Sequence, residues 1–378
     1  MPITYKCPNC GAALVFDSQT QKLSCAQCGF NQDVREYERR SAEQTAAGQA
    51  AMGQAATGQT AAWQTSAGQT AAGHTTEEHN SNVREPEMMK VKIYHCQSCG
   101  AELMSDEFTS AVICSFCGNP SLVEDRLQGA YKPQQIIPFR IDREGAKQIY
   151  KRWTKKGKLT PSTLYSDSTI EKISGIYVPF WLYDYNAESY MTAHANIIRT
   201  TRSGNTEHIY TDHYNVIRDV EANFARIPAD ASQKMDDEAM DKMEPYDYSA
   251  MEPFAMPYLS GYLSERYNYT SQQMLQRVGV RVNQYITQLT RNTISGYDTV
   301  QVTNNNVRMN NTYCSYVLLP VWVLNCRYNN KDFQFMLNGQ TGKIVAERPI
   351  SKAKAVLYGF GIFLGLLLIM TLGGLLIW

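Results

Sequence analysis

The sequence lacks an excess of charge of either sign, because its 378 residues carry 36 Lys and Arg and 36 Asp and Glu. A chain without net charge has no global attraction for a polyanion, so composition alone does not point to nucleic acid. The residues that follow Met1 also contain no apolar run, and we therefore expect no signal peptide. The length allows two or three compact units, one of them with a sizeable core.

Catalytic signatures are missing as well, since the chain contains neither a nucleophile elbow nor a complete phosphate loop. The sequence NGQTGK at 338–343 lacks the first glycine of a phosphate loop, because Leu337 occupies that position. We interpret it as a hairpin turn in which Gly339 and Gly342 adopt positive φ. We therefore expect a protein that is not an enzyme.

A few metal-binding side chains occur together outside the cysteines. They are His194, His208, His213, Glu188 and Asp212. Four side chains of this kind can bind a metal ion, but histidines scattered along strands are the more common arrangement. We interpret them as strand residues.

Charge is absent from residues 355–378, AVLYGFGIFLGLLLIMTLGGLLIW. As a helix this segment would be about 36 Å long, enough for a hydrocarbon core of about 30 Å. Basic residues precede it: Lys343, Arg348, Lys352 and Lys354. The positive-inside rule then places the N-terminal bulk in the cytoplasm of a single-pass protein of the cell membrane. Gly361 and Gly365, four residues apart, suit helix–helix contact in a homo-oligomer.

Ten cysteines are present, and eight of them repeat one spacing, Cys-x2-Cys-x14-Cys-x2-Cys. The two sets are Cys7, Cys10, Cys25 and Cys28, then Cys96, Cys99, Cys114 and Cys117. Two such knuckles joined by a hairpin provide tetrahedral S4 coordination, so we predict two zinc ribbons and two Zn²⁺ per chain. Iron, redox-active pairs and disulfides stay open as alternatives, although a disulfide framework requires a secretory context.

The predicted ribbons have little positive charge. Residues 1–40 contain five basic and four acidic side chains, and residues 90–128 contain three and five. Phosphate contact requires a basic stripe, which neither ribbon offers. We therefore expect the ribbons to dock protein partners; the alternative is a membrane-tethered nucleic-acid-binding protein.

Composition divides the chain into units: ribbon 1 at 1–40, a linker at 41–90, ribbon 2 at 91–128, a cytosolic domain at 129–350 and a transmembrane helix at 355–378. The linker repeats every five residues, with Gly48, Gly53, Gly58, Gly68 and Gly73 in phase. Such a sequence predicts a flexible tether, so we expect the two ribbons to move separately.

The domain at 129–350 is expected to be α+β. Strands are predicted at 176–200 and 206–220, with a turn at 203–205, and again at 299–348. Helix is predicted over 231–295, with a core stripe of Met274, Val278, Val282, Tyr285 and Leu289. SGIYVPFWLYDY at 174–185 resembles SYVLLPVWVLNC at 315–326, which indicates duplicated strand elements around a helical insertion.

A basic helix is predicted to begin after the N-cap Asp142. Its candidate lipid-contacting residues are Arg143, Lys147, Lys151, Arg152, Lys155 and Lys156. Basic groups near an anionic membrane surface favour binding. The alternatives are an exposed face or pairing with the acidic segment 228–254, which otherwise is interpreted as a solvated face.

The chain resembles a bacterial family of membrane-anchored proteins with TFIIB-type zinc ribbons, often labelled primosomal or helicase-like. The resemblance covers both ribbons and nearly all of 136–350. It is carried by IIPFRI (136–141), GIYVPFWLYD (175–184), IPADASQKMDDEAMDKMEPYDY (227–248), YLSGYLSERY (258–267), LLPVWVLN (318–325) and NGQTGK. It implies a cytosol-facing membrane adaptor, with some members linked to phage-shock or membrane-stress proteins. We therefore expect a non-enzymatic, tail-anchored scaffold.

Overall fold

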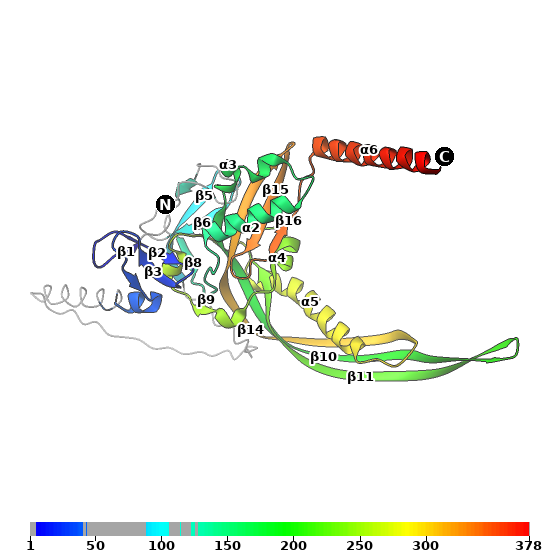
Figure 1. Cartoon of the computed structure of the whole chain (residues 1–378). Coiled ribbons are helices and arrows are strands. Elements are labelled where there is room, and N and C mark those ends of the chain that lie inside the picture. The colour runs from blue at the N-terminus through cyan, green and yellow to red at the C-terminus, as the bar shows by residue number, and fades with distance from the viewer. Residues whose placement is uncertain are drawn as a thin grey trace, which may run out of the picture.

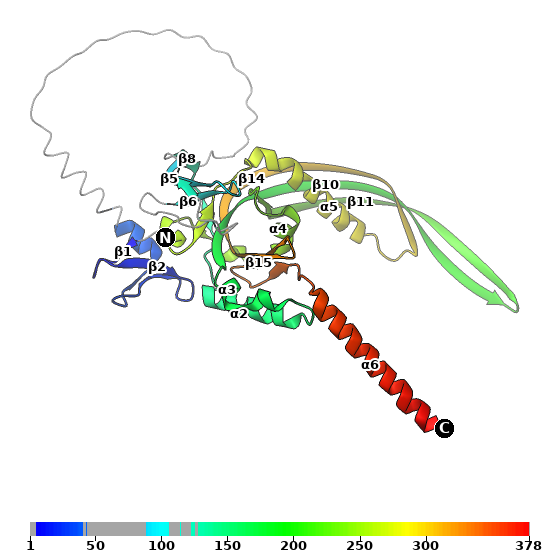
Figure 2. The ribbon, with the colours of Figure 1, turned by 90° about the horizontal axis from the view of Figure 1, so that it is seen from above.

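The computed structural model describes residues 5–40, 43, 88–105, 114, 122–124 and 128–377. Most of the predicted linker, 41–90, and Cys117 lie outside these residues. Figures 1 and 2 show an α+β body with the first cysteine-rich module on one side. A long β-hairpin and the C-terminal helix project from the other side. The prediction of a mixed α+β protein with two cysteine clusters and one apolar C-terminal helix is confirmed.

Ribbon 1 is a four-stranded antiparallel sheet in the order β1-β2-β3-β4. Its strands are β1 (Tyr5–Lys6), β2 (Ala13–Asp17), β3 (Lys22–Cys25) and β4 (Asn31–Gln32). Leu14 and Phe16 of β2 are buried whereas Val15 between them is exposed. This alternation is the period of a strand with one buried face. Ribbon 1 therefore has an apolar side to place against another surface.

All other described strands form one 12-stranded sheet in the order β12-β9-β14-β10-β13-β6-β5-β7, with β11, β15, β16 and β8 attached to its sides. The strands are β5 (Met88–Cys96), β6 (Glu102–Ser105), β7 (Leu122–Glu124), β8 (Gln128–Tyr131), β9 (Gln135–Ile136), β10 (Ser174–Ser203), β11 (Thr206–Asp230), β12 (Glu252–Pro253), β13 (Leu263–Glu265), β14 (Thr299–Tyr328), β15 (Lys331–Asn338) and β16 (Ile344–Ala346). The helices are α2 (Arg143–Lys156), α3 (Asp167–Ile170), α4 (Asp237–Met243), α5 (Ser271–Asn292) and α6 (Lys352–Ile377). The 3₁₀ turns are η1 (Ser162–Tyr165), η2 (Tyr248–Ala250) and η3 (Met256–Leu259).

The antiparallel neighbours β10 and β14 form the middle of the sheet, where both faces are covered. Trp181 and Trp322 belong to the core shared with ribbon 1, α2 and α5. Val178 and Val321 belong to the second core, shared with α4 and the second cysteine module. A strand buried on both faces has a nearly continuous apolar sequence, which explains the runs at 175–183 and 316–324.

The body contains two βαββ units, β9–α2–β10–β11 and β13–α5–β14–β15. The short first strand of each unit pairs in parallel with the long strand of the other, β13 with 176–177 and β9 with 317–318. Antiparallel partners then begin at Phe180 and Val321. Along each long strand, Pro179 or Pro320 lies between the residues that pair with the short parallel strand and those that pair with the antiparallel strand. The missing N–H of proline therefore does not interrupt either set of hydrogen bonds. The two similar sequence stretches therefore occupy equivalent places.

The two tryptophans make equivalent hydrogen bonds. Trp181 Nε1 donates to Tyr269 O at 2.8 Å, and Trp322 Nε1 donates to Ile141 O at 3.0 Å. Each acceptor immediately precedes a helix N-cap, Thr270 of α5 or Asp142 of α2. Each unit thus fixes the helix start of the other.

The predicted hairpin is confirmed by the pairing of Ser203 with Thr206 across a turn at Gly204, which has a φ of +63°. The predicted helix over 231–295 is confirmed only in α4 and α5, because Pro245, Pro253 and Pro257 interrupt the segment between them.

On α5, the buried row continues from Val282 to Ile286 and Thr290, whereas Tyr285 and Leu289 are exposed. The prediction for these last two residues was wrong. A row at spacing four is inclined to the helix axis and follows the twisted strands beneath it.

The NGQTGK segment forms the turn between β15 and β16, as predicted. Gly342 has the expected positive φ, +78°, but Gly339 does not. A Cβ on Gly339 would lie 2.6 Å from the Phe139 ring and 2.9 Å from Pro320, so close packing requires this glycine.

Candidate metal centres and buried ion pairs

The first cysteine set meets at one point. The Sγ atoms of Cys7 and Cys28 lie 3.5 Å apart, as do those of Cys10 and Cys25, and all four lie within 4.8 Å of one another. A tetrahedral S4 site with bonds of about 2.3 Å has S–S separations of roughly 3.8 Å. The four thiols therefore fit a single metal ion.

Local backbone geometry builds each knuckle. Gly11 N donates to Cys7 O at 2.8 Å and Gly29 N donates to Cys25 O at 2.9 Å. Both glycines have positive φ, +72° and +71°. The backbone N–H of Cys28, assisted by that of Gln27, lowers the pKa of the Cys25 thiol to about 7. The cluster thus favours a thiolate at Cys25, the form that binds metal, while burial and the neighbouring thiols raise the pKa of Cys28.

The second set is described for three of its four cysteines. Cys96, Cys99 and Cys114 converge in the same way, with 3.6 Å between the Sγ atoms of Cys99 and Cys114. Gly100 repeats the knuckle, with a φ of +68° and a 2.7 Å hydrogen bond from its N–H to Cys96 O. The fourth predicted ligand, Cys117, lies outside the described residues. These three thiols also suit a metal ion.

Ribbon 1 packs on the body. The Phe16 and Tyr258 ring centroids are 5.3 Å apart, and Ser260 Oγ donates to Leu14 O at 2.8 Å. Gln21 Nε2 donates to Phe139 O at 2.8 Å. Leu14 and Phe16 belong to the same core as Trp181 and Trp322. This differs from the expectation of a separately moving module, because the apolar side of β2 is covered by the body.

The second cysteine module is part of the large sheet. Its strand β6 pairs with β13, Met104 opposite Ser264 and Leu103 opposite Glu265. Lys234 Nζ donates to Cys99 O at 2.6 Å. In this structure neither cysteine module is separate from the body, while the unit boundaries stay predictions.

The histidines on the hairpin do not converge. His194 Nδ1 lies 2.7 Å from Asn215 Oδ1, and His213 Nδ1 lies 2.7 Å from Asn196 Oδ1. Asp212 pairs with Arg199. Within the described part of the chain, only the two cysteine groups have metal-site geometry. The interpretation of the histidines as strand residues therefore fits the structure.

The basic helix α2 divides into two parts. Lys147 Nζ lies 2.7 Å from Glu144 and 2.8 Å from Glu171, which also pairs with Arg143 at 3.7 Å. Lys151 pairs with Asp167 at 3.2 Å. The remaining candidates, Arg152, Lys155 and Lys156, are exposed. None of these six pairs with the acidic segment 228–254, although Arg140, just before the helix, lies 4.0 Å from Asp247 of that segment.

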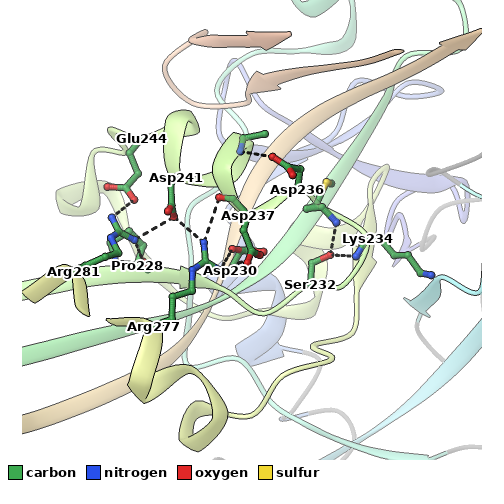
Figure 3. Close-up of polar contacts among 12 residues, drawn as sticks. Pro228, Asp230, Ser232, Lys234, Asp236, Asp237, Asp241, Glu244, Arg277 and Arg281 are labelled. Carbon is green, nitrogen blue, oxygen red and sulfur yellow. Dashed lines mark hydrogen bonds and ion pairs between the residues drawn. The ribbon is translucent and has the colours of Figure 1, made fainter. Parts of the chain in front are cut away.

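The acidic segment contacts α5 instead (Figure 3). Arg277 lies 2.9 Å from Asp230 and 3.0 Å from both Asp237 and Asp241. Arg281 lies 3.2 Å from Asp241 and 3.1 Å from Glu244. The Asp230 side chain is fully buried. The interpretation of this segment as a solvated face is therefore corrected for the acids that pair with α5, above all Asp230, whereas Asp236, Glu238 and Asp247 are exposed as expected. Two arginines four residues apart on one helix were the sequence signal for it.

Glu265 is a second buried acid, at the junction of β13 and the second cysteine module. It has no exposed surface, and its Oε1 accepts a 2.8 Å hydrogen bond from Ser232 Oγ. Its Oε2 has no hydrogen-bond partner among the described residues. Burial raises the pKa of Glu265 to about 8. The folded protein therefore favours the neutral carboxyl group.

Glu265→Gln is expected to make stability less dependent on pH. Between the ordinary carboxyl pKa and about 8, the folded state holds a proton that the unfolded state releases. Stability contributed by the protonated group is therefore lost as the pH rises through this window, by up to about 1.4 kcal/mol per unit. Thermal unfolding of the detergent-solubilised full chain at pH 6 and pH 8 measures the effect. Equal pH slopes for the variant and the wild type would contradict it.

Comparisons with known proteins place this arrangement in a family. No protein-family model and no solved structure matches the chain. The chain is 35% identical over 372 residues to the uncharacterized protein YdjG of Bacillus subtilis (strain 168). That similarity covers 98% of this chain and 97% of the relative, so it extends across the cysteine modules, the body and the apolar helix. The chain belongs to the family of Bacillus subtilis YdjG.

Proposed function

We propose that this protein is a non-enzymatic, tail-anchored scaffold of the cell membrane, whose two zinc ribbons dock protein partners on the cytoplasmic side. One observation carries the proposal: two cysteine clusters with metal-site geometry are built onto one body, and the chain of that body continues into an exposed apolar helix. That helix, α6, has a mean hydropathy of 2.0 over Lys352–Met370, and none of this window is buried. It is long and apolar enough to cross a membrane.

Zinc is the metal that we propose for both clusters. Four sulfur donors, arranged as in ribbon 1, suit Zn²⁺ in a closed structural site. An all-cysteine site without an open position supports folding and does not supply a catalytic metal. The TFIIB-type resemblance supports the same assignment, and Cys117 would complete the second site.

The orientation follows from the flank of α6. Arg348, Lys352 and Lys354 precede the apolar segment, so the body should stay in the cytoplasm. Reduced, metal-binding cysteines also suit that compartment. Partners of the membrane-stress class are the first candidates, on the resemblance alone.

Protein docking is favoured over nucleic-acid binding by the engagement of the basic groups of ribbon 1. Arg35 pairs with Glu252 of the body, and Arg40 pairs with Glu36 at 2.8 Å. Two of its five cations are thus paired, and the remaining three, Lys6, Lys22 and Arg39, are fewer than the basic stripe that phosphate contact requires.

A photo-crosslinking experiment in intact membranes tests the docking proposal. A crosslinking residue replaces exposed Lys22 or Arg39 on ribbon 1, and a matched control places it at Lys331, the exposed first residue of β15. We expect a discrete, nuclease-resistant protein adduct from the ribbon positions and at least tenfold less from the control. The adduct should disappear when Cys25→Ser is added. Adducts with nucleic acid, or equal capture from all three positions, would contradict the proposal.

A further inference from the structure

We propose that the C-terminal end of α2 and the first turns of α6 together form a binding site for the headgroups of anionic phospholipids. The site, named here the basic collar, consists of Arg152, Lys155, Lys156, Lys158, Arg348, Lys352 and Lys354. The inference rests on the proposed membrane anchoring through α6.

The two parts of the basic collar are far apart in sequence and joined by direct contacts. Ser351 N donates to Leu159 O at 2.9 Å, and Lys354 Nζ donates to Thr160 O at 2.7 Å. Lys158 Nζ lies 5.7 Å from the ring centroid of Tyr358 in α6. Figures 1 and 2 both show the end of α2 close to the start of α6.

The cations of the basic collar are available to a ligand. Arg152, Lys155, Lys156, Lys158 and Lys352 are exposed. In the described parts of the chain, none of them takes part in an ion pair, in contrast to Arg143, Lys147 and Lys151 at the other end of α2. Positive charge that is not neutralised internally is thus concentrated at one end of the helix.

Aromatic side chains hold the other cations in place. The Arg348 guanidinium lies 4.6 Å from the Trp153 ring centroid. Lys354 Nζ lies 5.4 Å from the ring centroid of Tyr165 and 3.3 Å from its hydroxyl group. These contacts position charge without neutralising it, because cation–π and hydroxyl partners carry no negative charge.

The position of the basic collar selects the ligand. It lies at the point where α6 leaves the body, and a spanning helix meets the headgroup layer there. Tyr358, in the second turn of α6, suits the same layer. Cations around a helix base suit a bilayer surface better than a linear polyanion, which requires a stripe. Each basic group near an anionic surface strengthens binding about fivefold.

Lysine acetylation of the full-length protein in nanodiscs tests the inference. One disc type contains phosphatidylcholine only, and the other contains phosphatidylglycerol as a third of its lipid. Mass spectrometry follows the acetylation rate of each lysine. We expect Lys155, Lys156 and Lys158 to react at least about fivefold more slowly in the anionic discs. Lys6 and Lys22 of ribbon 1, on the other side of the body from α6, serve as internal controls and should not change.

A triple variant provides the second measurement. Lys155→Gln, Lys156→Gln and Lys158→Gln together should reduce the phosphatidylglycerol that copurifies with the chain at least tenfold. The matched control changes exposed Lys6, Lys22 and Arg39 of ribbon 1 to Gln and should retain the lipid.

Three outcomes would count against the account. If the protein is inserted in both disc types and the lysines of the basic collar are acetylated at equal rates, the proposed lipid site is wrong. Protection by an added oligonucleotide in phosphatidylcholine discs, without protection by phosphatidylglycerol, also overturns it and identifies a nucleic-acid site. Extraction of the chain from membranes by alkaline carbonate contradicts the proposed anchoring instead, so the two failures are distinguishable.

Discussion

Cys25→Ser is expected to unfold ribbon 1 and release it from the body, while the large sheet stays folded. Ribbon 1 is too small to fold on its own core, so zinc should supply most of its folding free energy. Small structural zinc sites contribute about 10–16 kcal/mol. Leu14 and Phe16 would then leave their places against Ser260 and Tyr258. Amide exchange of the full chain should show protection lost in β2 and β3 and kept in β10 and β14.

A cysteine outside the two sets provides the matched control. Cys326 is half-buried in β14, where its Sγ contacts Phe333 O at 3.5 Å, and it belongs to neither cluster of the described residues. Cys326→Ser should leave both ribbons protected. Loss of protection in both ribbons after Cys25→Ser would mean that the eight cysteines act as one coupled site.

The equivalent change in the second set should reach further into the body. Cys114→Ser removes a ligand from the module whose strand β6 pairs with β13. We therefore expect the amides of Leu263–Glu265 to lose protection together with β5 and β6. This asymmetry follows from sheet pairing, since ribbon 1 contacts the body through side chains and not through a shared sheet.

Arg277→Ala is expected to destabilise the body by about 3–5 kcal/mol. The substitution leaves the buried carboxylate of Asp230 without its partner at 2.9 Å. Removing one partner of a buried ion pair lowers the free energy of unfolding by this amount, because the remaining charge is neither solvated nor paired. Urea unfolding of the detergent-solubilised chain, followed by the signal of the core tryptophans, measures the loss.

Two variants make this prediction specific. Arg291→Ala, at an exposed position on the same helix, should change stability by less than about 0.5 kcal/mol. Adding Asp230→Asn to Arg277→Ala should recover part of the loss, because the buried charge is then removed. Equal effects of Arg277→Ala and Arg291→Ala would show that the ion network in Figure 3 does not support the body.

Features encoded within a few neighbouring residues could be predicted from the sequence. Local chemistry determines three such features: the cysteine spacing, the turn at Gly204 and the uncharged C-terminal segment. The structure has the two cysteine clusters, the hairpin and the helix α6 at these places. The similar stretches at 174–185 and 315–326 also marked equivalent strands. Their mutual pairing could not be predicted, because each short partner strand belongs to the other unit.

Long-range contacts account for what the sequence did not predict. Gln21 meets Phe139 and Leu14 meets Ser260, pairs that are separated by more than a hundred residues. The ion pairs of the acids in 228–254 could not be predicted, because their partners Arg277 and Arg281 come later in the chain. Nothing in the local sequence indicates that this later helix packs against the acids. The alternation of buried Leu14, exposed Val15 and buried Phe16 appears only in the structure, because all three residues are apolar.

The zinc content of the purified full-length chain tests the central claim most directly. We predict two zinc ions per chain by elemental analysis, one in each set of four cysteines. Cys25→Ser and Cys114→Ser should each reduce the content to one, and Cys326→Ser should leave it at two. A chain that contains no zinc, one zinc ion shared by both sets, or iron in its place would contradict the account.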